Sequence, residues 1–374
     1  MGFDVDGRPD FLIVGAGVIG CAIARELVLR EAGSVVVIDR ATPGAESSGA
    51  AAGVLAVTSS RARRGAVLRL KRASAALYPV LCADLLGETR IDVEYCDAGL
   101  LELGFDDRDA DQLAAVVRRR VADGEPAEWL DAAAVRSREA GVSDDVRCGA
   151  YFAGDHALNS SRLVEALRVS AENHGARFLL NSPVREIERD GTRLLGIRAA
   201  DRWFSPGELI VAAGLGSRQI GSLLRAKMPI RPDRGEMLAL RPRRLPACTT
   251  VWREGYLVPR NNGELLIGST SARGEVEKTV RAGSVELLLR RAMRMVPDLG
   301  EAPIVRKWAG IRPMCTLRRP MIGPVAGYEN VTVATGHHRS GILLAPITAR
   351  LVAESILDSE TSIPLAPFKY RKKP

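Results

Sequence analysis

The feature that most restricts the fold of this chain is a glycine-rich turn near its N-terminus, "GAGVIG" at positions 15–20. An apolar segment, 11–14, leads into the turn, and an amphipathic segment closed by Gly33 leads out of it. A second apolar run, 35–38, ends at Asp39. This order predicts a Rossmann-like βαβ unit that binds a dinucleotide, because a strand, a glycine turn, a helix and a second buried strand follow one another.

Each glycine of the turn has its own expected role. Gly15 permits the tight turn, Gly17 lets the backbone approach a pyrophosphate, and Gly20 lets helix and strand pack closely. The N-terminus of the helix that begins near Val18 favours the phosphate charge. Asp39 follows about twenty residues later, where its carboxylate can accept hydrogen bonds from ribose hydroxyls.

The next segment, "ESSGAAAGVLAV" at 46–57, has almost no side-chain bulk. Ser47 and Ser48 can donate hydrogen bonds to phosphate oxygens, and 52–54 would let a planar ring lie against the backbone. A flexible alanine and glycine linker is the alternative interpretation. A second nucleotide-contacting stretch so close to the first indicates a cofactor that lies extended through the domain. Such an arrangement is more typical of FAD than of a nicotinamide dinucleotide that exchanges freely.

The chain has 374 residues, 46% of them hydrophobic, and can bury a large core. This size favours two domains, or one α/β unit with an insertion. Alternating strands from Pro229 onward, with a hairpin turn "NNG" at 261–263, predict an antiparallel second sheet. We therefore expect an α/β fold with FAD-binding segments 1–85, 146–226 and 319–374, and substrate-domain segments 86–145 and 227–318.

Composition and charge argue against several other classes of protein. No window reaches about 18 consecutive apolar residues, and the N-terminus does not resemble a signal peptide, so we expect a cytoplasmic protein without a membrane span. Six scattered cysteines without a CxxC pair indicate reduced thiols, and four dispersed histidines predict no metal site. The net charge of +8 lies in dispersed basic runs, and aromatic residues make up only 5% of the chain, so nucleic-acid binding is not expected.

Five motifs in order carry a resemblance to a known family: "VGAGVIG", "SSGAAAG", "YLVPR", "WAGIRP" and "GHHRSGILLAP". They resemble the D-amino-acid-oxidase superfamily of flavoproteins, and within it the glycine oxidases of the thiamine-pathway type. The similarity extends from Phe11 to Ile356. It implies the D-amino-acid-oxidase fold, in which a Rossmann-like FAD-binding domain of the glutathione-reductase type is joined to an antiparallel-sheet substrate domain.

The resemblance implies FAD as the cofactor and assigns residues to its binding. Asp39 and Arg40 would meet the adenosine ribose, and Val184 would contact adenine through its backbone. Related sarcosine-type oxidases can attach flavin to a cysteine, but Cys315 lies three residues past Arg312, so we expect non-covalent FAD. The residues expected to bind FAD are Gly15, Gly17, Val18, Ile19, Gly20, Asp39, Arg40, Ser47, Ser48, Ala52, Gly53, Val54, Val184, Gly214, His337, His338, Arg339, Ser340, Gly341, Ile342 and Leu343.

The stretch "ATGHHRSGILLAP", 334–346, places an arginine where an apolar strand turns into a helix. In the family this turn lies against the pyrimidine edge of the flavin, where a helix N-terminus stabilises developing negative charge. Pro346 has no N–H to donate, so we expect the regular helix to start near it. Arg339 would project over the ring and bind a substrate carboxylate with both of its nitrogens. The alternative is a surface arginine in a loop.

Arg312 and Tyr256 complete the expected catalytic set with Arg339. By resemblance, Arg312 would help to hold the substrate or the flavin carbonyl, and Tyr256 would offer its hydroxyl to the substrate carboxylate. An arginine stacked on Trp308, and a tyrosine simply packed in a strand, are the alternatives.

Three positions depart from the pattern of the glycine oxidases. Glu254 stands where they have a histidine, and Val54 and Ser271 stand where they have methionines. A smaller or more polar lining would enlarge the substrate pocket, so glycine as the substrate is more in doubt than amine oxidation.

The resemblance implies an FAD-dependent oxidase that deaminates glycine or another small amino acid or amine by hydride transfer to flavin N5. Its products would be an imine, then an oxo acid and ammonia, with hydrogen peroxide formed from O2. We expect a small amino-acid substrate, O2 as the electron acceptor and a homo-oligomer. The alternatives are a dehydrogenase that uses another acceptor, a tRNA-modifying flavoprotein that acts on a glycine-like group, and a non-catalytic FAD-binding scaffold.

Overall fold

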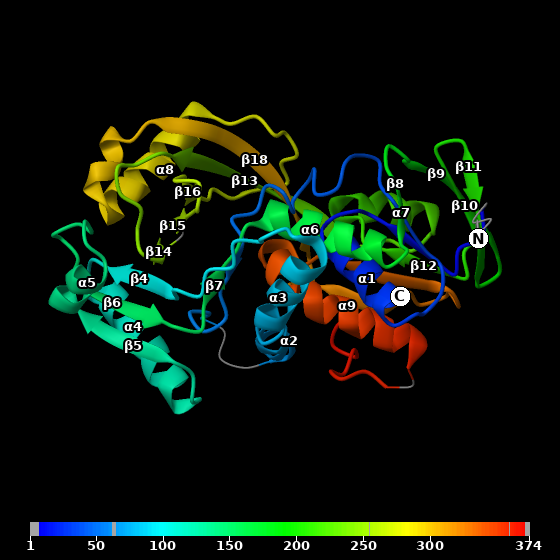
Figure 1. The fold of residues 1–374 in the computed structure, drawn as a ribbon, viewed down its shortest axis with the longest axis horizontal. Helices are drawn as coiled ribbons and strands as arrows, with labels where there is room; N and C mark the ends of the chain where they lie inside the picture. The colour runs from blue at the N-terminus through cyan, green and yellow to red at the C-terminus, as the bar shows by residue number, and fades with distance from the viewer. Residues whose placement is uncertain (1–6, 62–64, 254, 359, 371–374) are drawn as a thin grey trace.

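The computed structural model describes residues 7–61, 65–253, 255–358 and 360–370. It has two lobes that lie side by side (Figure 1). A six-stranded sheet of order β19-β20-β12-β1-β2-β8 forms the centre of one lobe, and a nine-stranded sheet forms the centre of the other. The expectation of an α/β fold with a second, largely antiparallel sheet is confirmed.

The six-stranded sheet is parallel except for one edge strand, β19. Its central strands read "FLIV" and "VVVI", and every residue in both is buried, as expected for a sheet covered on two faces. Helix α1 packs against both α6 and α9 beside this sheet. The strands are β1 (Phe11–Val14), β2 (Val35–Ile38), β8 (Arg177–Leu179), β12 (Glu208–Val211), β19 (Met321–Pro324) and β20 (Val331–Thr335). The helices of this lobe are α1 (Val18–Leu29), α2 (Ala66–Ala75), α3 (Tyr78–Thr89), α6 (Ser160–Asn173), α7 (Ser217–Leu223) and α9 (Gly341–Leu357).

The nine-stranded sheet is built around two long strands, β13 (Ile230–Leu240) and β18 (Ile304–Cys315), which pair antiparallel along their length. A parallel contact between β4 and β14 joins the two halves of the sheet. The expected "NNG" hairpin is confirmed between β15 and β16. The other strands are β4 (Leu100–Gly104), β5 (Ala127–Asp131), β6 (Cys148–Phe152), β14 (Thr249–Trp252), β15 (Gly255–Pro259), β16 (Leu265–Gly268) and β17 (Ala272–Arg273), and the helices are α4 (Asp107–Ala122), α5 (Ala132–Arg138) and α8 (Ala282–Met295).

Two small sheets complete the fold. Strands β9 (Val184–Asp190), β10 (Arg193–Ala199) and β11 (Arg202–Phe204) form a meander at the far end of the first lobe (Figure 1). Strands β3 (Val54–Leu55) and β7 (His156–Ala157) pair where the chain passes between the lobes. The expected division of the chain into five segments stays a prediction, and one strand crosses it: β6, which we assigned to an FAD-binding segment, pairs with β4 and β5 in the nine-stranded sheet.

Helix α9 has the longest apolar stretch of the described chain. The helical span His338–Leu357 is long and apolar enough to cross a membrane, but 61% of its apolar window is buried inside the protein. It packs against α1 and α2, so it is a core helix of the first lobe.

The expectation that α9 starts near Pro346 was wrong, because the helix begins at Gly341 and contains the proline. Pro346 has no N–H, so the carbonyl of Ile342, four residues earlier, loses its helical partner. The buried hydroxyl of Tyr78 donates a hydrogen bond to that carbonyl, and the hydroxyl of Ser74 donates to the next one, at Leu343. Hydroxyls from α2 and α3 thus satisfy the backbone around the proline.

Replacing Tyr78 by phenylalanine should lower the free energy of unfolding by about 1–3 kcal/mol, because the carbonyl of Ile342 is then buried without a partner. In a Pro346→Ala background the same change should cost less, because residue 346 then supplies the missing N–H. Urea unfolding of the four proteins of this double-mutant cycle measures the difference. An equal cost of Tyr78→Phe in both backgrounds would show that the hydroxyl does not serve this carbonyl.

Candidate functional site

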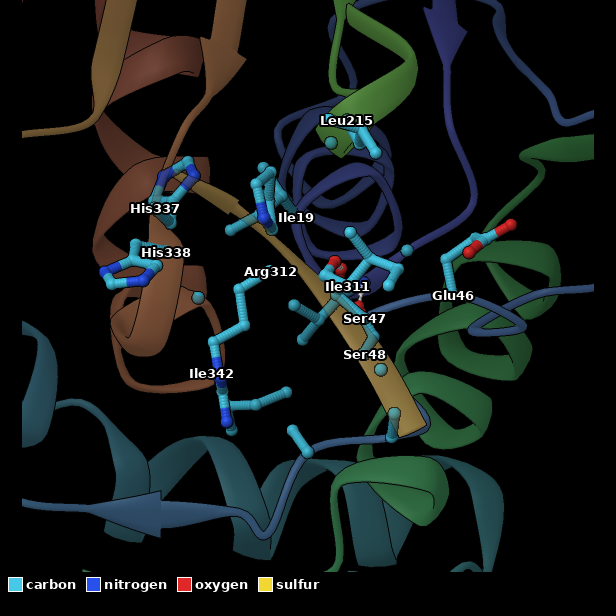
Figure 2. A pocket seen from close by; sticks show the side chains of 18 of the residues that line it. Ile19, Glu46, Ser47, Ser48, Leu215, Ile311, Arg312, His337, His338 and Ile342 are labelled. Carbon is cyan, nitrogen blue, oxygen red and sulfur yellow. Dashed lines mark hydrogen bonds between the residues drawn. The ribbon is translucent and has the colours of Figure 1, made fainter. Parts of the chain in front are cut away.

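A cavity of about 620 Å³ lies between the two lobes, at the carboxyl ends of the parallel strands. Val14, Ile38 and Ala212, at or next to the ends of β1, β2 and β12, line one part of it. Tyr256 and Arg312, from the nine-stranded sheet, line another. Because ligands of open α/β sheets bind at the carboxyl ends of the strands, this cavity is the candidate site (Figure 2).

The cavity brings together most of the residues that the sequence singled out. Tyr256, Arg312 and Arg339 all line it, and so do the expected FAD-binding residues with three exceptions. Figure 2 shows His337 and His338 on one side of the cavity and the serines of the 46–57 segment on the other. The three expected residues that do not line it are Gly20, Ser340 and Leu343.

The glycine turn at the start of α1 leaves room for an anion. Gly15 has a φ of +117°, and a Cβ there would lie 2.6 Å from the carbonyl oxygen of Ala212. A Cβ on Gly20 would lie 1.8 Å from the carbonyl oxygen of Gly15, so Gly20 serves the packing of helix on strand. Gly17 precedes α1 without a side chain, and no acidic residue occupies the first turn. The helix N-terminus therefore presents partial positive charge to the cavity.

Asp39 and Arg40 follow β2 at the edge of the cavity. The Oδ2 of Asp39 accepts from the N–H of Ala16 at 2.7 Å, and its Oδ1 accepts from the N–H of Ala41 at 2.9 Å. The carboxylate therefore holds the glycine turn in place. Each carboxylate oxygen has a second lone pair, so Asp39 can still accept from a sugar hydroxyl.

The two serines of the 46–57 segment differ in what their hydroxyls can do. The hydroxyl oxygen of Ser48 accepts from the N–H of Val18 at 3.0 Å, which leaves its proton to donate into the cavity. The hydroxyl of Ser47 donates to the carbonyl of Ile311, so its proton is already used inside the protein. Ser48 is therefore the better placed of the two to donate to a phosphate oxygen.

Tyr256 and Arg312 lie against glycines of neighbouring strands. Gly268 pairs with Tyr256, and a Cβ there would lie 2.3 Å from the tyrosine ring. A Cβ on Gly235 would lie 2.1 Å from Nη2 of Arg312. That nitrogen also donates to the hydroxyl of Ser269 at 2.8 Å. Both functional side chains are therefore held flat on the sheet, which only strand glycines permit.

Arg312 and Arg339 are two of the arginines that line the cavity. The side chain of Arg312 is 17% exposed, and its Nη1 donates to the carbonyl of Thr270 at 3.2 Å. Burial lowers the pKa of Arg312, and the nearby charge of Arg339 acts in the same direction. Arg339 is exposed, and it has no hydrogen-bond or ion-pair partner within the described ranges. The guanidinium of Arg312 and the unpaired guanidinium of Arg339 together favour the binding of an anion.

A buried aspartate that the sequence analysis missed anchors this part of the site. Asp233 is fully buried and accepts from the hydroxyl of Ser271 at 2.6 Å and from Nε2 of His338 at 2.7 Å. It also lies 3.7 Å from Nη1 of Arg312. Burial raises the pKa of Asp233, but the hydrogen bonds from Ser271 and His338 and the charge of Arg312 outweigh it, so the pKa is lowered. An ionised Asp233 therefore orients Arg312 and keeps the proton of His338 on Nε2.

His337, at the same turn, is a neutral side chain. It is buried, and its Nε2 lies 3.1 Å from the hydroxyl of Thr348. Burial lowers its pKa to about 3. Near neutral pH, His337 therefore adds no charge to the N-terminal end of α9.

Strand β18 contacts the 46–57 segment of the other lobe. The indole Nε1 of Trp308 donates to the carbonyl of Ala50 at 3.1 Å. A Cβ on Gly310 would lie 2.5 Å from Cβ of Ala50, so this approach also depends on glycine. Arg306, rather than Arg312, lies over the ring of Trp308, with its Cζ 4.6 Å from the ring centroid. The glycines inside β13, β16 and β18 were the signal in the sequence for these close approaches.

The positions that depart from the glycine-oxidase pattern lie in different surroundings. Val54 lines the cavity. Ser271 does not line it, and its hydroxyl serves Asp233 instead. Glu254 lies outside the described residues.

Comparison with known proteins gives consistent matches over the whole chain. A family model described as "FAD dependent oxidoreductase" (DAO) matches residues 10–355. A glycine oxidase of Geobacillus kaustophilus is 34% identical over 368 residues, which cover 98% of this chain and 97% of that protein. The hydrogen cyanide synthase subunit HcnC of Pseudomonas protegens is 28% identical, over 97% of this chain and 96% of that protein. The crystal structure of glycine oxidase from Geobacillus kaustophilus superposes with a TM-score of 0.94 at 32% identity, covering 98% of this chain and 99% of that one.

Replacing His337 by glutamine should reduce the loss of stability in acid. The pKa of His337 is about 3 in the folded protein, against an ordinary value of 6.5, so between these values only the unfolded chain binds this proton. The free energy of unfolding should therefore fall as the pH drops, by up to about 1.4 kcal/mol per pH unit from this residue. Urea unfolding between about pH 6.5 and about pH 4.5 should show a steeper fall for the wild type than for His337→Gln.

His174→Gln is the matched control, because this histidine is exposed at the end of α6. It should keep the pH dependence of the wild type. Parallel curves for the wild type and His337→Gln would contradict the neutral, buried state of His337.

Proposed function

Because the chain belongs to the DAO family of FAD-dependent oxidoreductases, in which its relatives act on amine donors, we propose that it oxidises glycine or another small amino acid with O2. The overall reaction converts the amino acid, O2 and water into an oxo acid, ammonia and hydrogen peroxide. The observation that supports this proposal most is the pair Arg312 and Arg339 beside Tyr256 in one cavity with the glycine turn. Their chemistry suits the carboxylate of an amino acid.

The residues of the cavity fit FAD. The N-terminus of α1 has no acidic residue in its first turn and no side chain at Gly17, which suits a pyrophosphate. Asp39 suits the adenosine ribose. Ala52, Gly53 and Val54 offer a wall with little bulk to a flat ring, and a Cβ on Gly53 would lie 1.9 Å from the carbonyl oxygen of Leu158.

We propose that FAD is held without a covalent bond. Cys315 is 2% exposed and does not line the cavity. Burial raises the pKa of its thiol, which disfavours the reactive thiolate. A homo-oligomeric state and a cytoplasmic location are further proposals, which rest on the resemblance and on the unpaired cysteines of the sequence.

Bound FAD would supply the hydride acceptor, and the side chains of the chain would place the substrate against it. Arg339 and Arg312 would bind the carboxylate, and the hydroxyl of Tyr256 would donate to it. Asp233 would keep Arg312 in place, so that its orientation is set before the substrate arrives. The first turn of α9, with no acidic residue, would stabilise negative charge at the edge of the cavity.

Replacing Arg339 by alanine should raise KM for amino acids by about tenfold or more, because a charge-assisted contact with the carboxylate is lost. The protein should remain yellow after gel filtration, since other residues hold FAD. Steady-state kinetics with flavin content measured in parallel gives both values. Arg118→Ala should keep the wild-type KM, because Arg118 is an exposed arginine of α4 that has no partner among the described residues. An unchanged KM in Arg339→Ala would remove this residue from substrate binding.

The electron acceptor can be identified by reoxidation. The enzyme reduced anaerobically with substrate should regain its oxidised spectrum rapidly on mixing with air-saturated buffer, and hydrogen peroxide should form in equal amount to the oxo acid. Stopped-flow absorbance and a peroxide assay over glycine, sarcosine and the D- and L-amino acids measure both. Slow reoxidation by air together with fast reoxidation by a quinone would show a dehydrogenase instead.

A further inference from the structure

The cavity also reaches β4, two strands from Tyr256, where a buried carboxylate lines it. The sheet order in this region is β15-β14-β4, and β4 and β14 lie side by side (Figure 1). Glu102, on β4, lines the cavity and is 7% exposed. Residues that line this region include Val54, Ala56, Ser59, Leu100, Glu102 and Val251.

Strand register places Glu102 and Tyr256 on the same face of the sheet. Glu102 pairs with Val251 on β14, and Val251 pairs with Tyr256 on β15. Residues that pair directly across strands point to the same side. Two strand spacings of about 4.8 Å put roughly 10 Å between the two positions. This separation exceeds the length of glycine, so a substrate that contacts both residues must be longer than glycine.

Glu102 and Arg253 are the charged residues of this region that line the cavity. The Oε1 of Glu102 accepts from Nη2 of Arg61 at 2.6 Å, while its Oε2 has no partner in the part of the chain that the structure describes. Arg253 also lines the cavity, but its guanidinium is bound to two carboxylates, Asp106 at 2.5 Å and Asp109 at 3.2 Å. The charge of Arg253 is thus offset by Asp106 and Asp109, and Glu102 pairs with Arg61 alone.

Burial raises the pKa of Glu102, which Arg61 opposes and the carboxylate of Asp109 reinforces. Burying the carboxylate of Glu102 costs free energy, because its one ion-pair partner, Arg61, is half-exposed. A cation that approached Oε2 of Glu102 would reduce this free-energy cost.

The cavity therefore has two guanidinium groups near Tyr256, those of Arg312 and Arg339, and a carboxylate two strands away from Tyr256, that of Glu102. Val251, on the strand between Tyr256 and Glu102, suits a chain of methylene groups.

We propose that Glu102 binds a cationic group at the far end of the substrate, so that the substrate is an amino acid whose side chain ends in an ammonium. This inference rests on the proposed function, because Arg312, Arg339 and Tyr256 must hold the carboxylate at the other end. The alternative role of Glu102 is an ion pair with Arg61 that only closes the end of the cavity.

Two ligands without an α-amino group test the proposed role of Glu102 directly, because they should bind without being oxidised. We would measure the dissociation constants of 6-aminohexanoate and hexanoate from the change that each causes in the absorbance of bound FAD. In the wild type, 6-aminohexanoate should bind about tenfold or more tightly than hexanoate, because it adds a charge-assisted hydrogen bond at Oε2. In Glu102→Gln this ratio should fall towards unity.

Glu128→Gln is the matched control, because Glu128 is an exposed carboxylate of β5, in the same sheet, and is also paired with an arginine, Arg138. It should keep the wild-type ratio. Equal affinity of the wild type for the two ligands, or an unchanged ratio in Glu102→Gln, overturns the role of Glu102 and leaves the proposed function standing. If neither ligand changes the flavin spectrum or inhibits glycine oxidation, the carboxylate site itself is wrong, and both proposals fall.

The wild-type ratio alone decides the question if Glu102→Gln does not fold. A second measurement compares the KM values of substrates. It sets D- and L-lysine, whose side chains end in an ammonium group, against D- and L-norleucine, whose side chains do not. The lysine isomer that is oxidised should show a KM about tenfold below that of the matching norleucine.

Discussion

The candidate site depends on a buried negative charge. Asp233 has no contact with solvent, and a buried carboxylate is stable only when hydrogen-bond donors and cations surround it. Here two donors, Ser271 after β16 and His338 in the turn before α9, and one cation, Arg312 on β18, come from three different parts of the chain. The carboxylate of Asp233 thus connects the nine-stranded sheet with the N-terminus of α9, where the edge of the flavin is expected.

Close backbone approach is the second constraint on the site. The two lobes approach closely at Gly310, where a Cβ would meet Ala50, and within the nine-stranded sheet the absence of a Cβ at Gly235 leaves room for Arg312. The glycine turn at Gly15 follows the same principle at the start of α1. These glycines do little chemistry themselves, but each sets the distance at which a functional group can lie.

Charge varies along the cavity in a way that suits an elongated zwitterion. The helix N-termini of α1 and α9 and the two arginines give positive potential where phosphate and carboxylate groups would lie. Two strands from Tyr256, Glu102 adds a carboxylate to the lining. The departure of Val54 from the methionine of the glycine oxidases lies on the wall of the same space, and its smaller side chain agrees with a longer substrate.

The sequence by itself determined the local elements and the class of cofactor. Apolar runs predicted β1 and β2, "GAGVIG" predicted the turn between them, and "NNG" predicted the hairpin of β15 and β16, because each depends on neighbouring residues only. The family motifs pointed to Tyr256, Arg312 and Arg339, and the structure places these three in one cavity. The roles assigned to them stay predictions.

Only the tertiary structure decided which distant groups meet. The start of α9 was predicted wrongly because the rule for Pro346 is local, whereas the hydroxyl that satisfies Ile342 comes from Tyr78, 264 residues away. Asp233 and Glu102 lie in strands that look ordinary in sequence, since burial and cross-strand register are set by pairing with remote segments. Contacts of this kind have no local pattern, so the fold alone determines them.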